Sequence, residues 1–207
     1  MTDEQPILIL GTGNRKKGIE LAEQFGPLGL SLKTLADCES PIEVVEDGET
    51  FAENATLKAT QQAKHLGTWV LGEDSGLQVD ALKGAPGIYS ARFSGSEATD
   101  ASNNELLLEK LDGVVLEKRS ARYVCHMSLS DPEGVVRAET EAYCRGRIGF
   151  EAKGSHGFGY DPLFEVLEYH QTFGQLGSTA KAILSHRARA ARRLIPALVG
   201  LLDSGQW

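Results

Sequence analysis

Two neighbouring acids, Glu73 and Asp74, follow an apolar run in the stretch TWVLGEDSG, and a third acid, Glu46, lies in VVEDGET. Adjacent like charges cost free energy unless a cation or solvent offsets them. A protein site that keeps carboxylates together commonly holds Mg²⁺, which takes oxygen ligands and links carboxylates to substrate phosphates. The acids are therefore candidate metal ligands, although solvated loop acids are the plainer interpretation of an isolated Glu-Asp pair.

A second candidate is the segment GTGNRKK at residues 11–17, which follows the first apolar run. The backbone N–H groups of a turn, the start of a helix and Lys17 would together attract an anion. The spacing matches neither the dinucleotide fingerprint GxGxxG nor the phosphate-binding loop GxxxxGK[ST]. The segment is as consistent with an ordinary turn as with a phosphate site.

Basic residues occur at several positions that suit a polyphosphate, namely Lys17, Lys58, Arg92, Lys181, His186 and Arg187. Each is also consistent with ordinary surface charge. His186 and Arg187 fall in the first turn of an expected helix, where the helix dipole disfavours cations by about 0.3–1 kcal/mol, so we expect an anionic or polar group nearby. The Gly-rich stretch GSHGFGYDPLF, residues 154–164, either brings backbone and Phe158 against a flat ligand or forms a tight turn.

The elements that would position these residues alternate between strand and helix. Residues 7–10 predict a buried strand, and the next segment predicts a helix with Ile19, Ala22 and Phe25 on one face. Thr50 and Glu53 form a capping box ahead of a helix that ends at Gly67, with an apolar face of Phe51, Ala55, Ala59, Ala63 and Leu66. Asn54 and Lys58 project together from a neighbouring face. TWVLGED predicts a strand that ends at the two acids.

The second half of the chain continues this pattern. Ser102 and Glu105 predict another capping box. Residues 121–130 alternate, and the turn DPEG joins them to residues 135–148, which predicts a hairpin with one apolar side of Tyr123, Cys125, Met127 and Leu129. A last helix from Ser185, kinked or ended by Pro196, would bury Ala188, Ala191, Leu194, Ile195 and Leu198. Interleaved helices and strands indicate an α/β domain with a mixed sheet.

Composition limits the class of protein. A chain of 207 residues can bury one sizeable core, so a single domain over residues 1–207 is expected. The net charge of −8 argues against broad binding to nucleic acid or to an anionic membrane. The acidic start MTDEQ lacks the basic segment of a signal peptide, so we expect a cytoplasmic protein. Three cysteines without CxxC spacing, Cys38, Cys125 and Cys144, indicate reduced thiols.

Five segments together resemble, in order and along almost the whole chain, the inosine triphosphate pyrophosphatase family of noncanonical purine NTP pyrophosphatases. They are TGNRKK at 12–17, EDGETFAENATLKA at 46–59, EDSGLQVDALKGAPGIYSARFSG at 73–95, GFGYDP at 157–162 and SHR at 185–187. The resemblance implies Mg²⁺-dependent hydrolysis of XTP, ITP and dITP to the monophosphate and pyrophosphate, which removes deaminated purines from the nucleotide pool. It also implies a homodimer and an elongated two-lobed α/β fold around a twisted mixed sheet with flanking helices, with the active cleft between the lobes.

The resemblance also implies roles for individual residues. Mg²⁺ would be bound by Glu46 and Asp74, with Glu73 as a further candidate, and Asp74 would accept a proton from the attacking water. The triphosphate would contact Thr12, Asn14, Lys17 and Lys58, of which Lys17 and Lys58 would also serve catalysis. Further substrate-binding residues would be Gly13, Arg15, Lys16 and Asn54. Ser75 and Arg92 would bind substrate. The nucleoside end would be surrounded by Phe158, Gly159, Tyr160, Asp161, Lys181, His186 and Arg187.

Some positions depart from the family pattern, and two other functions remain open. Glu73 stands where many members have Asp, Ser155 and His156 replace small residues, and Gln175 and Thr179 replace acids. Rejection of 6-amino purines would fall to Asp161, His186, Arg187 or the GFGYDP backbone. The alternatives are a catalytically silent nucleotide sensor, which pyrophosphate release would exclude, and a pyrophosphatase for other modified or pyrimidine nucleotides, which competition between ITP and UTP or dTTP would identify.

Overall fold

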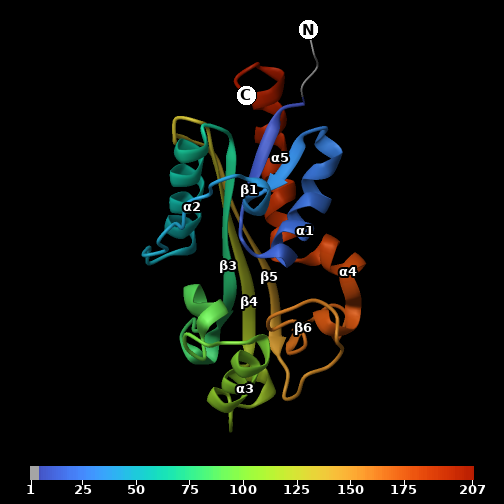
Figure 1. Ribbon diagram of the computed structural model, residues 1–207. Coiled ribbons are helices and arrows are strands. Elements are labelled where there is room, and N and C mark those ends of the chain that lie inside the picture. The colour runs from blue at the N-terminus through green and yellow to red at the C-terminus, as the bar shows by residue number, and fades with distance from the viewer. Residues whose placement is uncertain (1–4) are drawn as a thin grey trace. The chain divides into compact units, whose positions relative to one another are not determined.

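Among residues 5–207, which the computed structural model describes, seven strands form one sheet in the order β2-β1-β3-β4-β5-β6-β7 (Figure 1). Strands β2 and β3 run parallel to β1, whereas β6 is antiparallel to β5 and β7 is antiparallel to β6. The sheet is therefore mixed, and the predicted α/β class is confirmed. The acidic start MTDEQ, from which a cytoplasmic protein is predicted, lies largely outside the described residues, which begin at residue 5.

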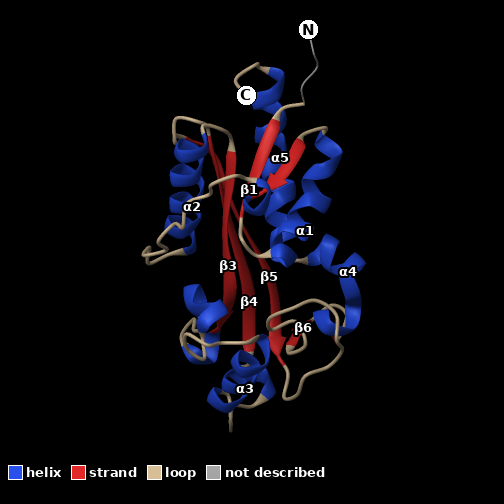
Figure 2. Cartoon of the chain, in the orientation of Figure 1, coloured by secondary structure: helices blue, strands red, loops and turns tan. Residues whose placement is uncertain are grey.

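The bounds of the elements are as follows, and Figure 2 distinguishes helices from strands. The strands are β1 Ile7–Gly11, β2 Ser31–Thr34, β3 Val70–Val79, β4 Ser120–Ser130, β5 Val136–Ile148, β6 Phe164–Val166 and β7 Gln171–Thr172. The α-helices are α1 Arg15–Phe25, α2 Phe51–Leu66, α3 Asp100–Lys110, α4 Phe173–Leu184 and α5 His186–Asp203. Short 3₁₀ helices include η4, Gly87–Arg92.

The chain separates by its internal contacts into two compact units. Unit 1 comprises the residues up to Asp74 together with Cys125–Ala142 and Arg187–Trp207. Unit 2 comprises Ser75–Val124 and Tyr143–His186. The assignment of residues 1–207 to one domain and the cleft between lobes stay predictions.

Unit 1 covers both faces of its strands with helices. Leu8 and Leu10 of β1 pack with Leu21 and Phe25 of α1 and with the apolar stripe of α5. Ile9 points to the opposite face, where it packs with Ala63 of α2. Figure 1 shows α1 and α5 on one side of these strands and α2 on the other. The continuous apolar run of β1 therefore reflects a strand that is buried on both faces.

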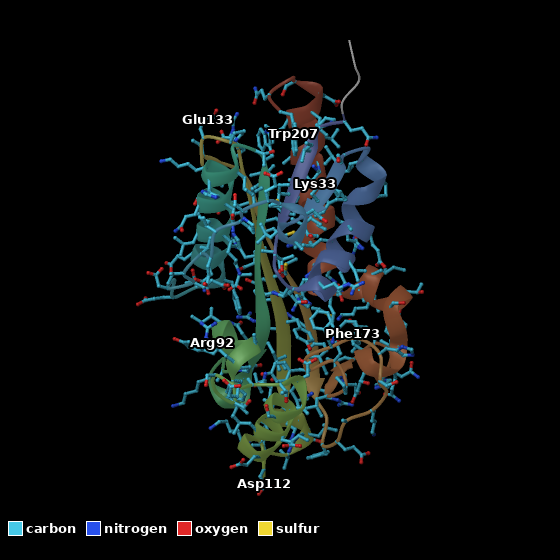
Figure 3. The ribbon with its side chains drawn as sticks, in the orientation of Figure 1. Lys33, Arg92, Asp112, Glu133, Phe173 and Trp207 are labelled. Carbon is cyan, nitrogen blue, oxygen red and sulfur yellow. The ribbon has the colours of Figure 1, made fainter. Side chains whose placement is uncertain are left out.

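The two units also differ in how their cores are built. Trp207, labelled in Figure 3, stacks on Trp69 with ring centroids 4.5 Å apart, which ties the end of the chain to unit 1. Unit 2 has an aromatic core in which Tyr123 packs against Phe164, and Phe164 stacks on Phe173 at 5.7 Å. Both cores receive residues from β4: Ala121 and Tyr123 enter the core of unit 2, and Cys125, Met127 and Leu129 enter that of unit 1. The predicted burial of alternate side chains along this strand is therefore confirmed.

Local helix signals are confirmed in part. The capping box of Thr50 and Glu53 begins α2, and Gly67 ends it in the left-handed conformation. The predicted face of α1 is wrong at Ile19, which is 53% exposed, because Gly18, Leu21 and Phe25 form the buried stripe instead.

The start of α3 differs from its prediction, and of the two effects predicted for Pro196 in α5, a kink or an end, the end is excluded. The capping box predicted at Ser102 and Glu105 is wrong, since Thr99 is the N-cap and exchanges hydrogen bonds with Ser102. Helix α5 begins directly after Ser185 and does not end at Pro196, because it runs on to Asp203. Its predicted stripe is buried at Ala188, Ala191, Leu194 and Leu198.

The two acids of the central stretch do not end a strand, contrary to the expectation from sequence. Strand β3 continues through Glu73 and Asp74 to Val79. It pairs with β1 only as far as Gly11, which lies opposite Gly72. The acids therefore follow the carboxyl end of β1, where the crevice of an α/β sheet usually lies, while their own strand runs on because Leu77 and Val79 enter the core of unit 2.

Candidate functional site

The candidate phosphate-binding residues of the segment GTGNRKK lie at the start of α1, in unit 1. Asn14 is the N-cap, and its Oδ1 accepts the backbone N–H groups of Lys16 at 3.0 Å and Lys17 at 3.2 Å. Thr12 Oγ1 accepts the N–H of Asn14 at 3.1 Å. The segment from Gly13 to Lys16 is exposed, so an anion can reach this helix N-terminus.

Glu73 is a buried ion-pair centre. Its Oε2 lies 3.1 Å from Lys17 Nζ, and its Oε1 accepts from Arg187 Nη2 at 3.0 Å. Arg187 also pairs with Glu20 of α1. Burial alone would lower the pKa of Arg187, but the carboxylates of Glu73 and Glu20 raise it above its ordinary value. The anionic group expected beside the start of the last helix is therefore supplied by the chain itself.

Asp74 faces a different cation. Lys58 Nζ donates to Asp74 Oδ1 at 3.0 Å and to Glu46 Oε2 at 2.9 Å, so one ammonium group links the two acids. The second oxygen, Asp74 Oδ2, is buried without a hydrogen-bond partner among residues 5–207. Burial raises the pKa of Asp74 in spite of Lys58. For Lys58, burial lowers the pKa, but the attraction of Asp74 and Glu46 outweighs it and the net shift is upward.

Close packing of α2 on β3 places Lys58 beside Asp74. A Cβ on Gly72 would lie 2.1 Å from the carbonyl oxygen of Ala55 and 2.6 Å from the backbone nitrogen of Ala59, so a side chain does not fit there. Asn54, one turn before Lys58, is 1% exposed and accepts the N–H of Gly48 at 2.9 Å. Asn54 therefore holds the loop that carries Glu46.

These acids can be tested against the needs of Mg²⁺. Among the described residues, no group of three or more His, Cys, Asp or Glu side chains could hold a metal ion. Mg²⁺ usually takes only one or two protein carboxylates and completes its shell with water and phosphate oxygens. Glu46 and Asp74 fit this requirement, because Asp74 Oδ2 is an unpaired buried acceptor. Glu73 fits poorly, because Lys17 and Arg187 already neutralise it.

Unit 2 contains a separate group of candidate residues, whose hydrogen bonds converge on Asp161. Its Oδ2 accepts from Lys181 Nζ at 2.5 Å and from the N–H of Phe158 at 2.9 Å, and its Oδ1 accepts from the hydroxyl of Tyr123 at 3.2 Å. Lys181 Nζ also lies 4.0 Å from the centroid of the Phe158 ring, a cation–π contact. Asp161 thus acts as the anchor of the GFGYDP segment and of α4.

Further hydrogen bonds hold the same segment. Tyr160 is buried and donates from its hydroxyl to the carbonyl of Ser90 at 2.8 Å. Asn104 of α3 donates to the carbonyl of Gly159 at 2.9 Å. The segment is therefore fixed from several elements of unit 2.

The other predicted site residues are His186, Ser75 and Arg92, and their surroundings differ. His186 is buried, and its ring stacks on Tyr123 with centroids 4.7 Å apart. Ser75 is half-buried in β3 directly after Asp74. Arg92, labelled in Figure 3, lies at the end of η4 and is exposed. Its guanidinium lies 5.3 Å from the centroid of the Tyr89 ring.

Sequence reasoning misses two partners of the site. Glu20 pairs with Arg187 across 167 positions, so no local pattern could have revealed it. The alternation of its strand assigns Tyr123 only to the apolar side. Its hydroxyl was the available signal, because a buried Tyr O–H usually finds an acceptor.

The model of the Ham1 family matches residues 8–197. The chain belongs to the Ham1 family. A relative from Rhodopirellula baltica, named dITP/XTP pyrophosphatase, is 55% identical over 197 residues, which cover 95% of each chain. One of the same name from Exiguobacterium sibiricum is 46% identical over 94% of this chain and 98% of the relative.

Solved structures agree with this assignment to the Ham1 family. The Ham1 protein of Staphylococcus aureus has a TM-score of 0.82 at 36% identity, over 94% of this chain and 98% of that one. A Ham1 protein from Coxiella burnetii has a TM-score of 0.86 at 33% identity, over 95% and 100% of the two chains. Within the described part of the chain, no helix is both long enough and apolar enough to cross a bilayer.

Proposed function

We propose that this chain hydrolyses the noncanonical purine nucleoside triphosphates XTP, ITP and dITP to the monophosphate and pyrophosphate, and so removes deaminated purines from the nucleotide pool. The observation that carries the proposal is the group of Glu46, Lys58 and Asp74 with the unpaired buried oxygen of Asp74. Family membership and the names of the relatives support the substrate class.

The cations of unit 1 neutralise the triphosphate in this proposal. A nucleoside triphosphate carries about four negative charges, which repel a nucleophile unless they are offset. Lys17 pairs with the buried carboxylate of Glu73 and Lys58 with that of Asp74, so both ammonium groups are fixed in place. The exposed N-terminus of α1 adds the partial positive charge of its backbone. Mg²⁺, bound by Glu46 and Asp74, would add Lewis-acid neutralisation of the phosphate oxygens.

Asp74 is the proton acceptor for the attacking water in this scheme. Its Oδ1 is engaged by Lys58, which orients the carboxylate. The unpaired Oδ2 has two lone-pair directions, so it can accept a proton from a water molecule and also serve as the metal ligand. Because burial raises the pKa of Asp74, the carboxylate is a stronger base than an exposed aspartate.

The nucleoside end of the substrate is assigned to the cluster of unit 2. Phe158 is half-buried, so its ring can stack on a purine while Lys181 lies beside it. Asp161 is occupied by donors from the chain, so we assign it a positioning role and leave recognition of the purine edge to Lys181, His186 and the backbone of the segment. By resemblance to the family we also propose that the protein is a homodimer and that it is located in the cytoplasm. Sedimentation of the purified protein tests the homodimer.

The test is pyrophosphate release from ITP, XTP, GTP and ATP by purified protein, with and without Mg²⁺. We expect Mg²⁺-dependent release from ITP and XTP and little from GTP or ATP. Asp74→Asn should lower kcat by about 100-fold or more, which is the usual contribution of a general base. Binding of ITP without release from any nucleotide would support the silent sensor, and preferred hydrolysis of UTP or dTTP would support another substrate class.

A further inference from the structure

Tyr123 links the GFGYDP segment and α4 to the central sheet. The carboxylate of Asp161 accepts hydrogen bonds from Phe158 of its own segment and from Lys181 of α4. The hydroxyl of Tyr123, which donates to the other oxygen at 3.2 Å, comes from β4. Strands in the middle of a sheet are rigid compared with loops. The sheet therefore defines where the Asp161 carboxylate lies.

The ring of Tyr123 is itself held in one orientation. It packs against Phe164 with centroids 4.6 Å apart and lies 6.3 Å from the ring of Phe173. It also stacks on the ring of His186 at an interplanar angle of 12°. Burial raises the pKa of Tyr123 well above its ordinary value, so the hydroxyl remains a neutral donor. One side chain thus contacts both Asp161 and His186.

We propose that Tyr123 is a positioning residue that sets base selectivity. Its hydroxyl fixes Asp161, and Asp161 in turn fixes the ammonium group of Lys181 and the backbone at Phe158. This inference rests on the proposed function, in which Lys181, Phe158 and His186 contact the nucleoside. Without the hydroxyl, the Asp161 carboxylate gains rotational freedom and the two groups it holds lose their alignment with the purine.

The decisive variant is Tyr123→Phe, which removes only the hydroxyl and keeps the ring stacked on His186. We expect kcat/KM for ITP to fall about tenfold, the lower end of the usual effect of one hydrogen bond to a charged group. The fall should come mainly from KM, with kcat within about twofold of the parent protein, because the phosphate cluster is untouched. The preference for ITP over ATP should decrease as well. Tyr169→Phe is the matched control, since Tyr169 is 51% exposed.

Two further measurements separate positioning from a general loss of stability and from failure of the proposed function. Hydrogen exchange of residues 156–161 should become faster in Tyr123→Phe and stay unchanged in Tyr169→Phe. In an Asp161→Asn background, Tyr123→Phe should have little further effect on KM, because the two residues act in series.

These experiments distinguish failure of the Tyr123 inference from failure of the proposed function. If the parent protein hydrolyses ITP but Tyr123→Phe keeps the same KM and the same preference for ITP over ATP, the inference is overturned and the function stands. If the parent protein releases no pyrophosphate, the function is wrong, and unchanged hydrogen exchange in Tyr123→Phe would then overturn the positioning role independently.

Discussion

Replacement of Gly72 by alanine tests whether the site depends on backbone contact between β3 and α2. The added Cβ would lie 2.1 Å from the carbonyl oxygen of Ala55, 2.6 Å from the nitrogen of Ala59 and 2.9 Å from its Cβ, whereas ordinary contacts begin near 3.4 Å. None of these atoms can rotate away, because they belong to the helix backbone or to a rigid methyl group. Helix α2 must therefore move outward by more than about 1 Å.

The displacement of α2 determines the expected loss of stability and of activity in Gly72→Ala. Overpacking of a well-packed interior typically costs about 1–3 kcal/mol, and a clash with backbone belongs at the upper end of that range. For a chain of this size, about 3 kcal/mol corresponds to a Tm lower by roughly 6–12 °C. The same movement carries Lys58 away from Asp74 and Glu46, which it contacts at 3.0 and 2.9 Å. A misplacement of about 1 Å can reduce the rate about 100-fold.

Thermal unfolding followed by circular dichroism, together with pyrophosphate release, measures both effects. The control is Gly200→Ala in α5, where no atom lies within 4 Å of the added Cβ. That change should leave activity intact and stabilise the protein by about 0.5–1 kcal/mol, since alanine favours the helix. A Gly72→Ala protein whose Tm lies within about 2 °C of the parent would refute the argument from close packing.

Three other substitutions test the electrostatics and the helix caps. Burial raises the pKa of Asp74, so its charge costs stability at neutral pH, and this cost disappears as pH falls through the raised pKa. Asp74→Asn should therefore have a Tm no lower than the parent at pH 7, with the difference shrinking on acidification; a clearly lower Tm at pH 7 would contradict this. Glu73→Gln should instead lower stability by about 3 kcal/mol, measured by urea unfolding, because its two cationic partners lose a buried counter-charge. An unchanged urea midpoint would show that this pairing contributes little. Thr99→Ala removes the N-cap of α3 and should cost about 1 kcal/mol in the same assay. Its control is Ser96→Ala, an exposed change outside the helix that should stay within about 0.5 kcal/mol of the parent, and equal stability of the two variants would contradict the capping role.

Signals carried by neighbouring residues were enough to predict much of the framework. The capping box of Thr50 and Glu53, the end of α2 at Gly67 and the alternation along β4 each depend on interactions within a few positions. Residue chemistry already marked the acids and most of the cations as candidates, and the resemblance to the pyrophosphatase family assigned their roles and added Ser75. The signals failed where a nearby competing pattern existed, as when Thr99 rather than Ser102 became the N-cap of α3.

The partners of the charged residues were decided by tertiary structure. Glu73 and Asp74 are adjacent in the sequence, and nothing local predicts that one meets Lys17 and Arg187 while the other meets Lys58. The alternation of side chains along β3 turns the two carboxylates to opposite faces of the sheet, and each face carries different helices. The sequence alone determined which residue types and local elements are present. The surroundings that make Glu73 an ion-pair centre and leave an oxygen of Asp74 unpaired exist only after folding, because burial and pairing come from segments that are far apart in the chain.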